Sequence, residues 1–239
     1  MGIVVTVDGP AGAGKSTVAK KLAKELGWRY LDTGALYRAV ALTALDRGLP
    51  THDGEGLGAL TATLAIRQDE EGRTFVGDDD VSSELRTERV SQAASQVSAH
   101  PSVRRALVDV QRRVADDGPL ICEGRDMGTV IFPDAALKVF LDASPRTRAE
   151  RRRDDLQARG EDVDLDELVS QIEERDHRDA NRDTAPLLQQ DDQIAIDTSE
   201  MSIERVLERL RELVVERCEN GGTDNRLGNC LDSRIPSGP

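Results

Sequence analysis

Five short apolar runs along the chain have the length and the Val, Ile and Leu content of strands that are buried on both faces of a parallel sheet. They are Ile3–Val7, Trp28–Leu31, Leu120–Glu123, Leu137–Leu141 and Gln193–Ile196. Other segments have apolar residues at helical spacing: Lys15–Leu26, Ala35–Arg47, Pro101–Asp116, Pro145–Arg159, Asp166–Asp179 and Ser202–Glu219. Strands that alternate with helices predict an α/β fold with a doubly wound, five-stranded parallel sheet.

Two regions depart from this alternation. Within residues 57–96, Ala65–Arg67 and Arg73–Val76 have strand-like composition, and the turn signal at Glu71–Gly72 predicts a hairpin. We therefore predict a single domain over residues 1–220 that carries a small, mostly antiparallel insert at about 57–96. Residues 221–239 are rich in Gly, Asn, Asp, Ser and Pro, so we expect a disordered tail without chemistry.

The apolar content and the net charge of the chain indicate where it resides and what it can bind. No apolar run approaches the roughly 20 residues that a membrane-spanning helix needs, and the N-terminus lacks a signal-peptide pattern. The first residues, MGIVVT, loosely match a myristoylation pattern, but Ile3–Val7 fits a buried strand better. We expect a cytoplasmic protein without a membrane partner. The net charge of −13 also disfavours nucleic-acid binding, which needs a broad basic face.

A glycine-rich motif follows the first predicted strand and opens the first predicted helix. This segment, here called the phosphate loop, fits G-x-x-x-x-G-K-[ST] and consists of Gly9, Pro10, Ala11, Gly12, Ala13, Gly14, Lys15, Ser16 and Thr17. Its glycines let backbone N–H groups point into one hollow, and the helix adds its positive end. Lys15 can reach the β- and γ-phosphates of a nucleotide, and Ser16 can ligate Mg²⁺. A chance glycine turn is the other interpretation, but the strand-to-helix context favours binding of a nucleoside triphosphate.

The chain lacks the Asn-Lys-x-Asp motif of a GTPase switch, which disfavours that class of nucleotide-binding protein. It has instead arginines at helical spacing. Two clusters each share one helix face: Arg148, Arg151 and Arg152 on one predicted helix, and Arg175, Asp179 and Arg182, with Arg178 beside them, on the next. Each cluster alone is more typical of a solvated face. Because both flank the flexible stretch QARGEDVDLD, we expect a lid over about 148–182 that closes positive charge over a phosphoryl group.

Two strand ends supply further polar groups. Asp32, Thr33, Tyr37 and Arg38 follow the second predicted strand, and Arg125 and Asp126 follow the third. Ligands of doubly wound sheets bind beyond the carboxyl ends of the strands, where both turns lie. We expect them to hold a second phosphate and a polar ligand group. The structural alternatives are a helix N-cap for Asp126 and a salt bridge for Arg125.

Several blocks together resemble the bacterial cytidylate kinases, a family of nucleoside monophosphate kinases. They are DGPAGAGKST, YLDTGALYRA, SQAASQVSAHPSVR, EGRDMGTVIFPDA, KVFLDAS and ERDHRDANRDTAPL. The resemblance runs from about Ile3 to Leu213, and GRDMGT and the block at 175–182 are specific to this family. It implies transfer of the γ-phosphoryl group of ATP to CMP or dCMP with Mg²⁺. We expect small-molecule substrates only, and a monomer.

The resemblance also implies roles for individual residues. The matches are Arg38, Arg125 and Arg182 for the monophosphate, Thr33 and Tyr37 for the shape of that pocket, Ser95, Arg104 and Asp126 for cytosine, and Arg175 and Asp179 for the sugar. The residues implied in catalysis are Lys15, Arg125, Arg148, Arg152 and Arg182. A second carboxylate on the metal side has no clear match, because the third strand ends in Glu123 rather than Asp.

These residue types predict catalysis by alignment and charge neutralisation. No general base is needed, since the phosphate oxygen of CMP is already a nucleophile. Two alternatives stay open: a nucleotide-binding regulator without turnover, and a small-molecule kinase of the shikimate or gluconate type. Kinases of that type are shorter and lack an insert like residues 57–96.

Overall fold

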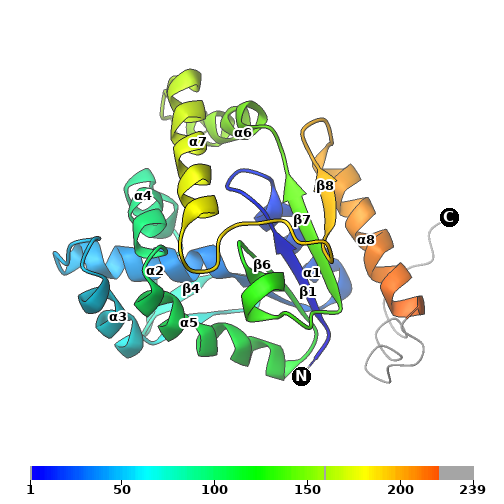
Figure 1. Cartoon of the computed structure of the whole chain (residues 1–239), viewed down its shortest axis with the longest axis horizontal. Coiled ribbons are helices and arrows are strands. Elements are labelled where there is room, and N and C mark those ends of the chain that lie inside the picture. The colour runs from blue at the N-terminus through cyan, green and yellow to red at the C-terminus, as the bar shows by residue number, and fades with distance from the viewer. Residues whose placement is uncertain (1, 159, 221–239) are drawn as a thin grey trace.

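The computed structural model describes residues 2–158 and 160–220, and a parallel sheet forms its centre. The strands are β1 (Val4–Asp8), β2 (Arg29–Asp32), β6 (Leu120–Gly124), β7 (Leu137–Asp142) and β8 (Ile194–Asp197), in the order β2-β6-β1-β7-β8. Every pair of neighbours is parallel. The predicted five-stranded, doubly wound sheet is confirmed (Figure 1).

Helices cover both faces of the sheet because successive side chains of a strand point to opposite sides. On β1, Val4 belongs to one hydrophobic core, whereas Val5 and Val7 belong to the other. The first core is completed by α2 (Thr33–Asp46), α3 (Gly54–Thr63), α4 (Glu88–Val97) and α5 (Pro101–Arg113). The second is completed by α1 (Lys15–Leu26) and α8 (Ile203–Asn220). The sheet is thus the middle of three layers.

The hairpin predicted within residues 57–96 is confirmed. Strand β3 (Ile66–Gln68) pairs antiparallel with β4 (Thr74–Val76), which pairs with β5 (Asp79–Asp80). Helices α3 and α4, which flank these strands, are missing from the prediction. Three glycines in α3 lower its helix propensity. In α4 the buried positions do follow a helical period, but they are mostly small or polar residues, which weakens the pattern.

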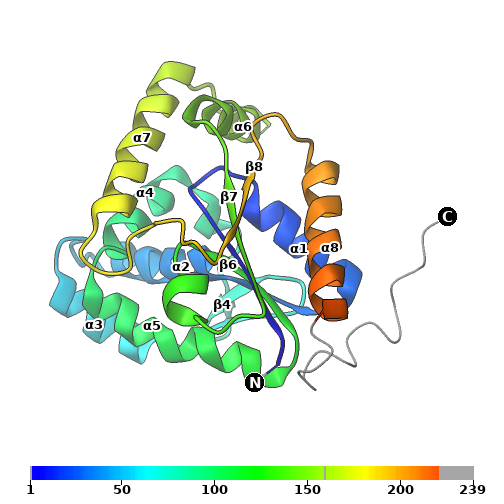
Figure 2. The ribbon, with the colours of Figure 1, turned by 45° about the vertical axis from the view of Figure 1, so that its right-hand side comes forward.

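Helices α6 (Pro145–Gln157) and α7 (Leu165–Asn181) carry most of the segment expected to act as a lid. They pack on each other through a small core of their own, made by Ala149, Leu156, Leu168 and Ile172. Figures 1 and 2 both show this pair beyond the carboxyl ends of the central strands, with α7 beside α4. The pair therefore faces the edge of the sheet where a ligand is expected.

Two sequence-based expectations concern the rest of the chain. Among the described residues, no helix combines the length and the apolar character needed to cross a bilayer. The segment 221–239, for which a disordered tail is expected, lies outside the described residues.

Candidate active site

A cleft of about 820 Å³ lies at the carboxyl end of the sheet, between the phosphate loop, α4 and the pair α6–α7. Nearly every predicted site residue lines it: Ala11, Gly12, Ala13, Gly14, Lys15, Ser16, Thr17, Thr33, Tyr37, Arg38, Ser95, Arg104, Arg125, Asp126, Arg148, Arg152, Arg175, Asp179 and Arg182. Gly9 and Pro10 belong to the same loop but are not among the lining residues. The fold thus gathers predicted residues from distant parts of the chain into one cleft.

The conformation of the phosphate loop depends on its glycines. Gly9 has a φ of +143°, and a Cβ at this position would lie 1.9 Å from the carbonyl oxygen of Leu141. Gly14, with a φ of +88°, precedes the first residue of α1. Helix α1 therefore begins at the cleft and adds its N-terminal N–H groups to those of the loop. This end of the cleft is suited to a phosphate chain.

Lys15 and Glu123 are two buried ionisable residues beside the phosphate loop. Lys15 Nζ donates a hydrogen bond to the Pro10 carbonyl oxygen over 2.7 Å, and Ser16 Oγ donates one to Glu123 Oε1 over 2.5 Å. Burial and then the charge of Arg125 lower the pKa of Lys15 to about 7, while burial and then the charge of Asp32 raise the pKa of Glu123 to about 7. A bound phosphate would favour the charged lysine, and a bound cation the charged glutamate.

The arginines on the shared face of α6 have different hydrogen-bond partners. Arg148 is buried, and it pairs with Asp176 of α7 over 2.5 Å and donates to the carbonyl oxygens of Ala143 and Ala11. These contacts join α6 to α7 and to the phosphate loop. Arg151 instead donates to Thr198, at the end of β8.

Arg152, the third arginine of this face, reaches across the cleft. Its Nη2 pairs with the Glu88 carboxylate at the start of α4 over 2.5 Å, and both side chains are about one-third exposed. A partly exposed ion pair of this kind contributes little to stability, so another anion can readily replace the carboxylate. Of the two predicted catalytic arginines on α6, Arg152 is thus the more available to a phosphate.

Guanidinium groups concentrate in the middle of the cleft. Arg38 pairs with Asp32 over 2.9 Å, and Arg125 pairs with Asp179 over 3.0 Å. The salt bridge considered for Arg125 is therefore present, but its partner is itself a cleft residue. Burial and then the charge of Arg125 lower the pKa of Arg175 to about 10.

Several buried guanidinium nitrogens in this part of the cleft lack a hydrogen-bond acceptor in the part of the chain that the structure describes. Among the described residues, the buried nitrogens without a hydrogen-bond partner include Arg38 Nε, Arg175 Nε and Arg182 Nη2. Buried N–H groups of charged side chains are costly to leave unpaired. An anion bound between these arginines would supply the missing acceptors.

The far end of the cleft is built for a polar, planar group. Arg104 and Asp126 form a buried ion pair, and Arg104 also lies over the Tyr37 ring, 5.5 Å from its centroid. Asp126 stands at the N-cap position of the short π-helix η3 (Met127–Ile131), but its side chain makes no capping hydrogen bond. The N-cap alternative for this side chain is therefore wrong. The hydroxyl of Ser95, which is buried, accepts a hydrogen bond from Arg178 Nη1 over 3.0 Å.

Some cleft residues are missing from the predicted set. Glu123 lines the cleft and accepts a hydrogen bond from Ser16, and its place at the end of a strand was the available signal. Arg178 and Glu88 also line the cleft. Arg178 was expected beside the cluster on its helix but was assigned no ligand, whereas nothing in the local sequence distinguishes Glu88 from other surface glutamates.

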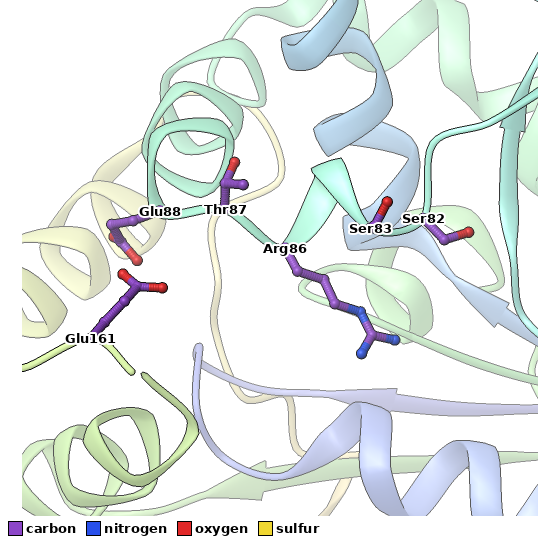
Figure 3. Close-up of a pocket in the computed structure, with 6 residues that line it drawn as sticks. All are labelled: Ser82, Ser83, Arg86, Thr87, Glu88 and Glu161. Carbon is purple, nitrogen blue, oxygen red and sulfur yellow. The ribbon is translucent and has the colours of Figure 1, made fainter. Parts of the chain in front are cut away.

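A smaller hollow of about 600 Å³ lies where the insert faces the loop that follows α6. Its lining residues, all drawn in Figure 3, are Ser82, Ser83, Arg86, Thr87, Glu88 and Glu161. In that view the carboxylates of Glu88 and Glu161 point toward one another from the insert and from the segment between α6 and α7. This hollow lies between the insert and the segment that is expected to act as a lid.

Comparisons with known proteins agree with this geometry. A family model described as cytidylate kinase matches residues 5–216. A cytidylate kinase of Mycobacterium leprae (strain Br4923) is 48% identical over 216 residues, which cover 90% of this chain and 96% of that protein. One from Pelotomaculum thermopropionicum is 48% identical over 221 residues, covering 91% and 96%. A solved structure of an uncharacterized protein from Eubacterium ventriosum is 14% identical, and the match covers 90% of this chain and 99% of that one. The TM-score of 0.50 indicates a likeness of fold alone.

Proposed function

The chain belongs to the cytidylate kinase family, and we propose that it transfers the γ-phosphoryl group of ATP to CMP or dCMP, giving ADP and CDP or dCDP. One observation carries this proposal. In the described part of the chain, a single cleft joins a phosphate loop at one end, arginine nitrogens without hydrogen-bond acceptors in the middle, and the Arg104–Asp126 pair at the other. Two phosphate-bearing ligands can then meet in line, with the base of the acceptor at the far end.

On the donor side, the phosphate loop holds the phosphates of ATP. The residues from Gly9 to Thr17 other than Pro10 supply backbone N–H groups, and Lys15 supplies a charge that follows the migrating phosphoryl group. The contact from Lys15 to the Pro10 carbonyl oxygen is local, so the ammonium can turn toward a phosphate without breaking an ion pair.

Ser16 and Glu123 fit a magnesium ion that arrives with ATP. Both present oxygen ligands at one point beside the phosphate loop, and Mg²⁺ in such sites takes one or two protein groups together with substrate phosphates. When bound, the ion would neutralise part of the negative charge of the ATP phosphates. In the site as described, the Ser16 hydroxyl donates to the carboxylate and so keeps the two groups together.

On the acceptor side, three arginines bind the monophosphate. Arg38, Arg125 and Arg182 stand around the middle of the cleft, and the planar fork of a guanidinium pairs with phosphate oxygens while it stays charged. Thr33 donates to the Glu123 carbonyl oxygen over 2.8 Å and fixes the turn beneath them. Arg175 and Asp179 remain for the sugar hydroxyls.

The transfer itself needs alignment and electrostatic stabilisation. The acceptor phosphate oxygen attacks the γ-phosphorus, and the bond from that phosphorus to the β–γ bridging oxygen breaks. Lys15, Arg125, Arg152 and Arg182 neutralise the charge that spreads over the transferring group. Closure of α6 and α7 over the cleft excludes water, which would otherwise accept the phosphoryl group.

A coupled assay of ADP formation with ATP and a panel of acceptors tests this proposal. We expect CMP and dCMP to be used far better than UMP, AMP or shikimate. Binding of CMP and ATP without ADP formation would instead identify a nucleotide-binding regulator. Preference for shikimate or a sugar acid would identify a kinase of another type.

Arg152→Ala is expected to lower kcat by roughly 10²-fold, the cost typical of one lost charge-stabilising donor, and to change the KM for CMP much less. Arg152 pairs with Glu88 in the structure and meets phosphates only on closure. The matched variant Glu88→Gln removes the ion pair but keeps the arginine, so its kcat should stay within about twofold. Steady-state kinetics with both substrates would refute the assignment if Arg152→Ala lost affinity for CMP at an unchanged kcat.

Glu123→Gln is expected to raise the Mg²⁺ concentration for half-maximal activity by about tenfold, because the variant keeps the shape but loses the anionic ligand. Binding of CMP measured without metal should stay the same, since Glu123 faces Ser16 on the donor side. Glu71→Gln, at the exposed tip of the insert hairpin, is the control. An unchanged Mg²⁺ dependence in Glu123→Gln would remove this residue from the metal site.

A further inference from the structure

Asp8 is a buried carboxylate that the proposed mechanism does not use. It ends β1, directly before the phosphate loop, and is 1% exposed. Its Oδ1 accepts a hydrogen bond from Met127 N and its Oδ2 from Gly128 N, each over 2.8 Å. A third hydrogen bond comes from Gln193 Nε2 over 3.2 Å. Burial, opposed by the two backbone bonds, raises the pKa of Asp8 to about 6.

The two backbone donors are the first N–H groups of η3. Such groups have no partner within their own helix and are normally satisfied by the side chain at the N-cap position. In η3 that position is Asp126, whose side chain makes no capping bond and instead pairs with Arg104 in the cleft. Asp8, at the end of β1, therefore caps η3 in place of the side chain at the N-cap position.

This arrangement leaves little room for η3 to move. A Cβ added at Gly128 would lie 2.9 Å from Thr6 Oγ1 and 3.3 Å from Gln193 Nε2, so the first turn of η3 lies directly against β1. The backbone of Asp126 has φ −146° and ψ 25°, which is neither helical nor regular strand. Its side-chain direction thus depends on how the residues after it are held.

We propose that Asp8 is a positioning residue for base recognition: it caps η3 from β1, so that the Asp126 carboxylate is not used as the cap and instead pairs with Arg104 where the base of the acceptor nucleotide binds. This inference rests on the proposed function, in which Asp126 reads cytosine. Because Asp8 also precedes Gly9, the same residue ties the base-reading group to the strand that carries the phosphate loop.

Asp8→Asn tests the inference with a side chain of the same shape. The amide can accept from one of the two N–H groups, but its own NH₂ faces the other, so η3 must shift. We expect the ratio of kcat/KM for CMP to that for UMP to fall by roughly tenfold, the effect of losing one good hydrogen bond to a charged group. The affinity for ATP, measured by titration without CMP, should change much less. Asp197→Asn, at the exposed end of β8, is the matched control and should keep the wild-type ratio.

A double-mutant cycle separates positioning from a merely structural role. If Asp8 acts through Asp126, then Asp8→Asn should cause no further loss of the CMP-to-UMP ratio in an Asp126→Ala background. A wild-type ratio in Asp8→Asn, or a loss that adds to that of Asp126→Ala, would overturn the inference. A ratio that Asp126→Ala itself leaves unchanged would instead contradict the proposed function.

Gly128→Ala changes the same contact between Asp8 and η3, but on the η3 side. It tests the inference even if Asp8→Asn does not fold. Its methyl group should push the first turn of η3 away from Asp8 and lower the ratio in the same direction. An unchanged ratio in a folded Gly128→Ala protein would overturn the inference.

Discussion

Lys15→Ala should lower kcat for phosphoryl transfer by roughly 10²–10³-fold while the protein stays folded, because the lysine stabilises charge that develops on the migrating group. The side chain is 5% exposed, and burial together with Arg125 lowers its pKa to about 7. Keeping the Lys15 ammonium charged in this buried site lowers the free energy of unfolding. The variant should therefore melt at a temperature close to that of the wild type, or above it.

Kinetics and thermal melting of Lys15→Ala test this expectation together. Lys24→Ala, an exposed position in the last turn of α1, is the control and should keep wild-type rates. Near-normal turnover in a folded Lys15→Ala protein would contradict the role of the phosphate loop.

Asp126→Ala should reduce the preference for CMP over UMP more than any other single change in the cleft. Cytosine has a donating 4-amino group where uracil has an accepting oxygen, so a carboxylate at this point attracts one base and repels the other. We expect kcat/KM to fall by roughly 10²-fold or more for CMP and much less for UMP, since sites built for a hydrogen bond discriminate strongly.

The same substitution also affects stability. It leaves Arg104, which is 5% exposed, without its carboxylate, so the melting temperature should fall as well. Asp134→Ala, at an exposed position after η3, is the control for both measurements. A CMP-to-UMP ratio that stays at the wild-type value in a folded Asp126→Ala protein would remove this residue from base recognition.

Local signals in the sequence were sufficient for the sheet and for much of the cleft. The five strands differ from prediction by at most one residue at either end, because their apolar runs are short and bounded by turns or helix caps. The expected burial on both faces is wrong for β2 and β8, which are mostly exposed or half-buried because they lie at the edges of the sheet. The phosphate loop could be predicted because its glycines, lysine and hydroxyl residues are adjacent. Arg125 and Asp126 could be placed at the same edge because parallel strands all end there.

Contacts between distant parts of the chain could not be predicted. Ser16 and Glu123 are 107 positions apart, and only the pairing of the sheet brings their side chains together. The ion pair between Arg152 and Glu88 depends on where α6 lies relative to α4. Helix α4 itself was missed because its buried face consists mainly of small residues, which carry little hydrophobic signal. No role for Asp8 could be predicted either, because its hydrogen bonds reach η3, which is distant in the sequence.

Direct analysis of the products formed from ATP and CMP tests the central proposal most closely. Phosphorus NMR of a mixture with the purified full-length protein and Mg²⁺ resolves ADP, CDP and inorganic phosphate as they appear. We expect ADP and CDP to form in equal amounts, with little free phosphate and with much slower turnover when UMP replaces CMP. Formation of ADP and free phosphate without CDP, or no turnover despite binding of both nucleotides, would contradict it.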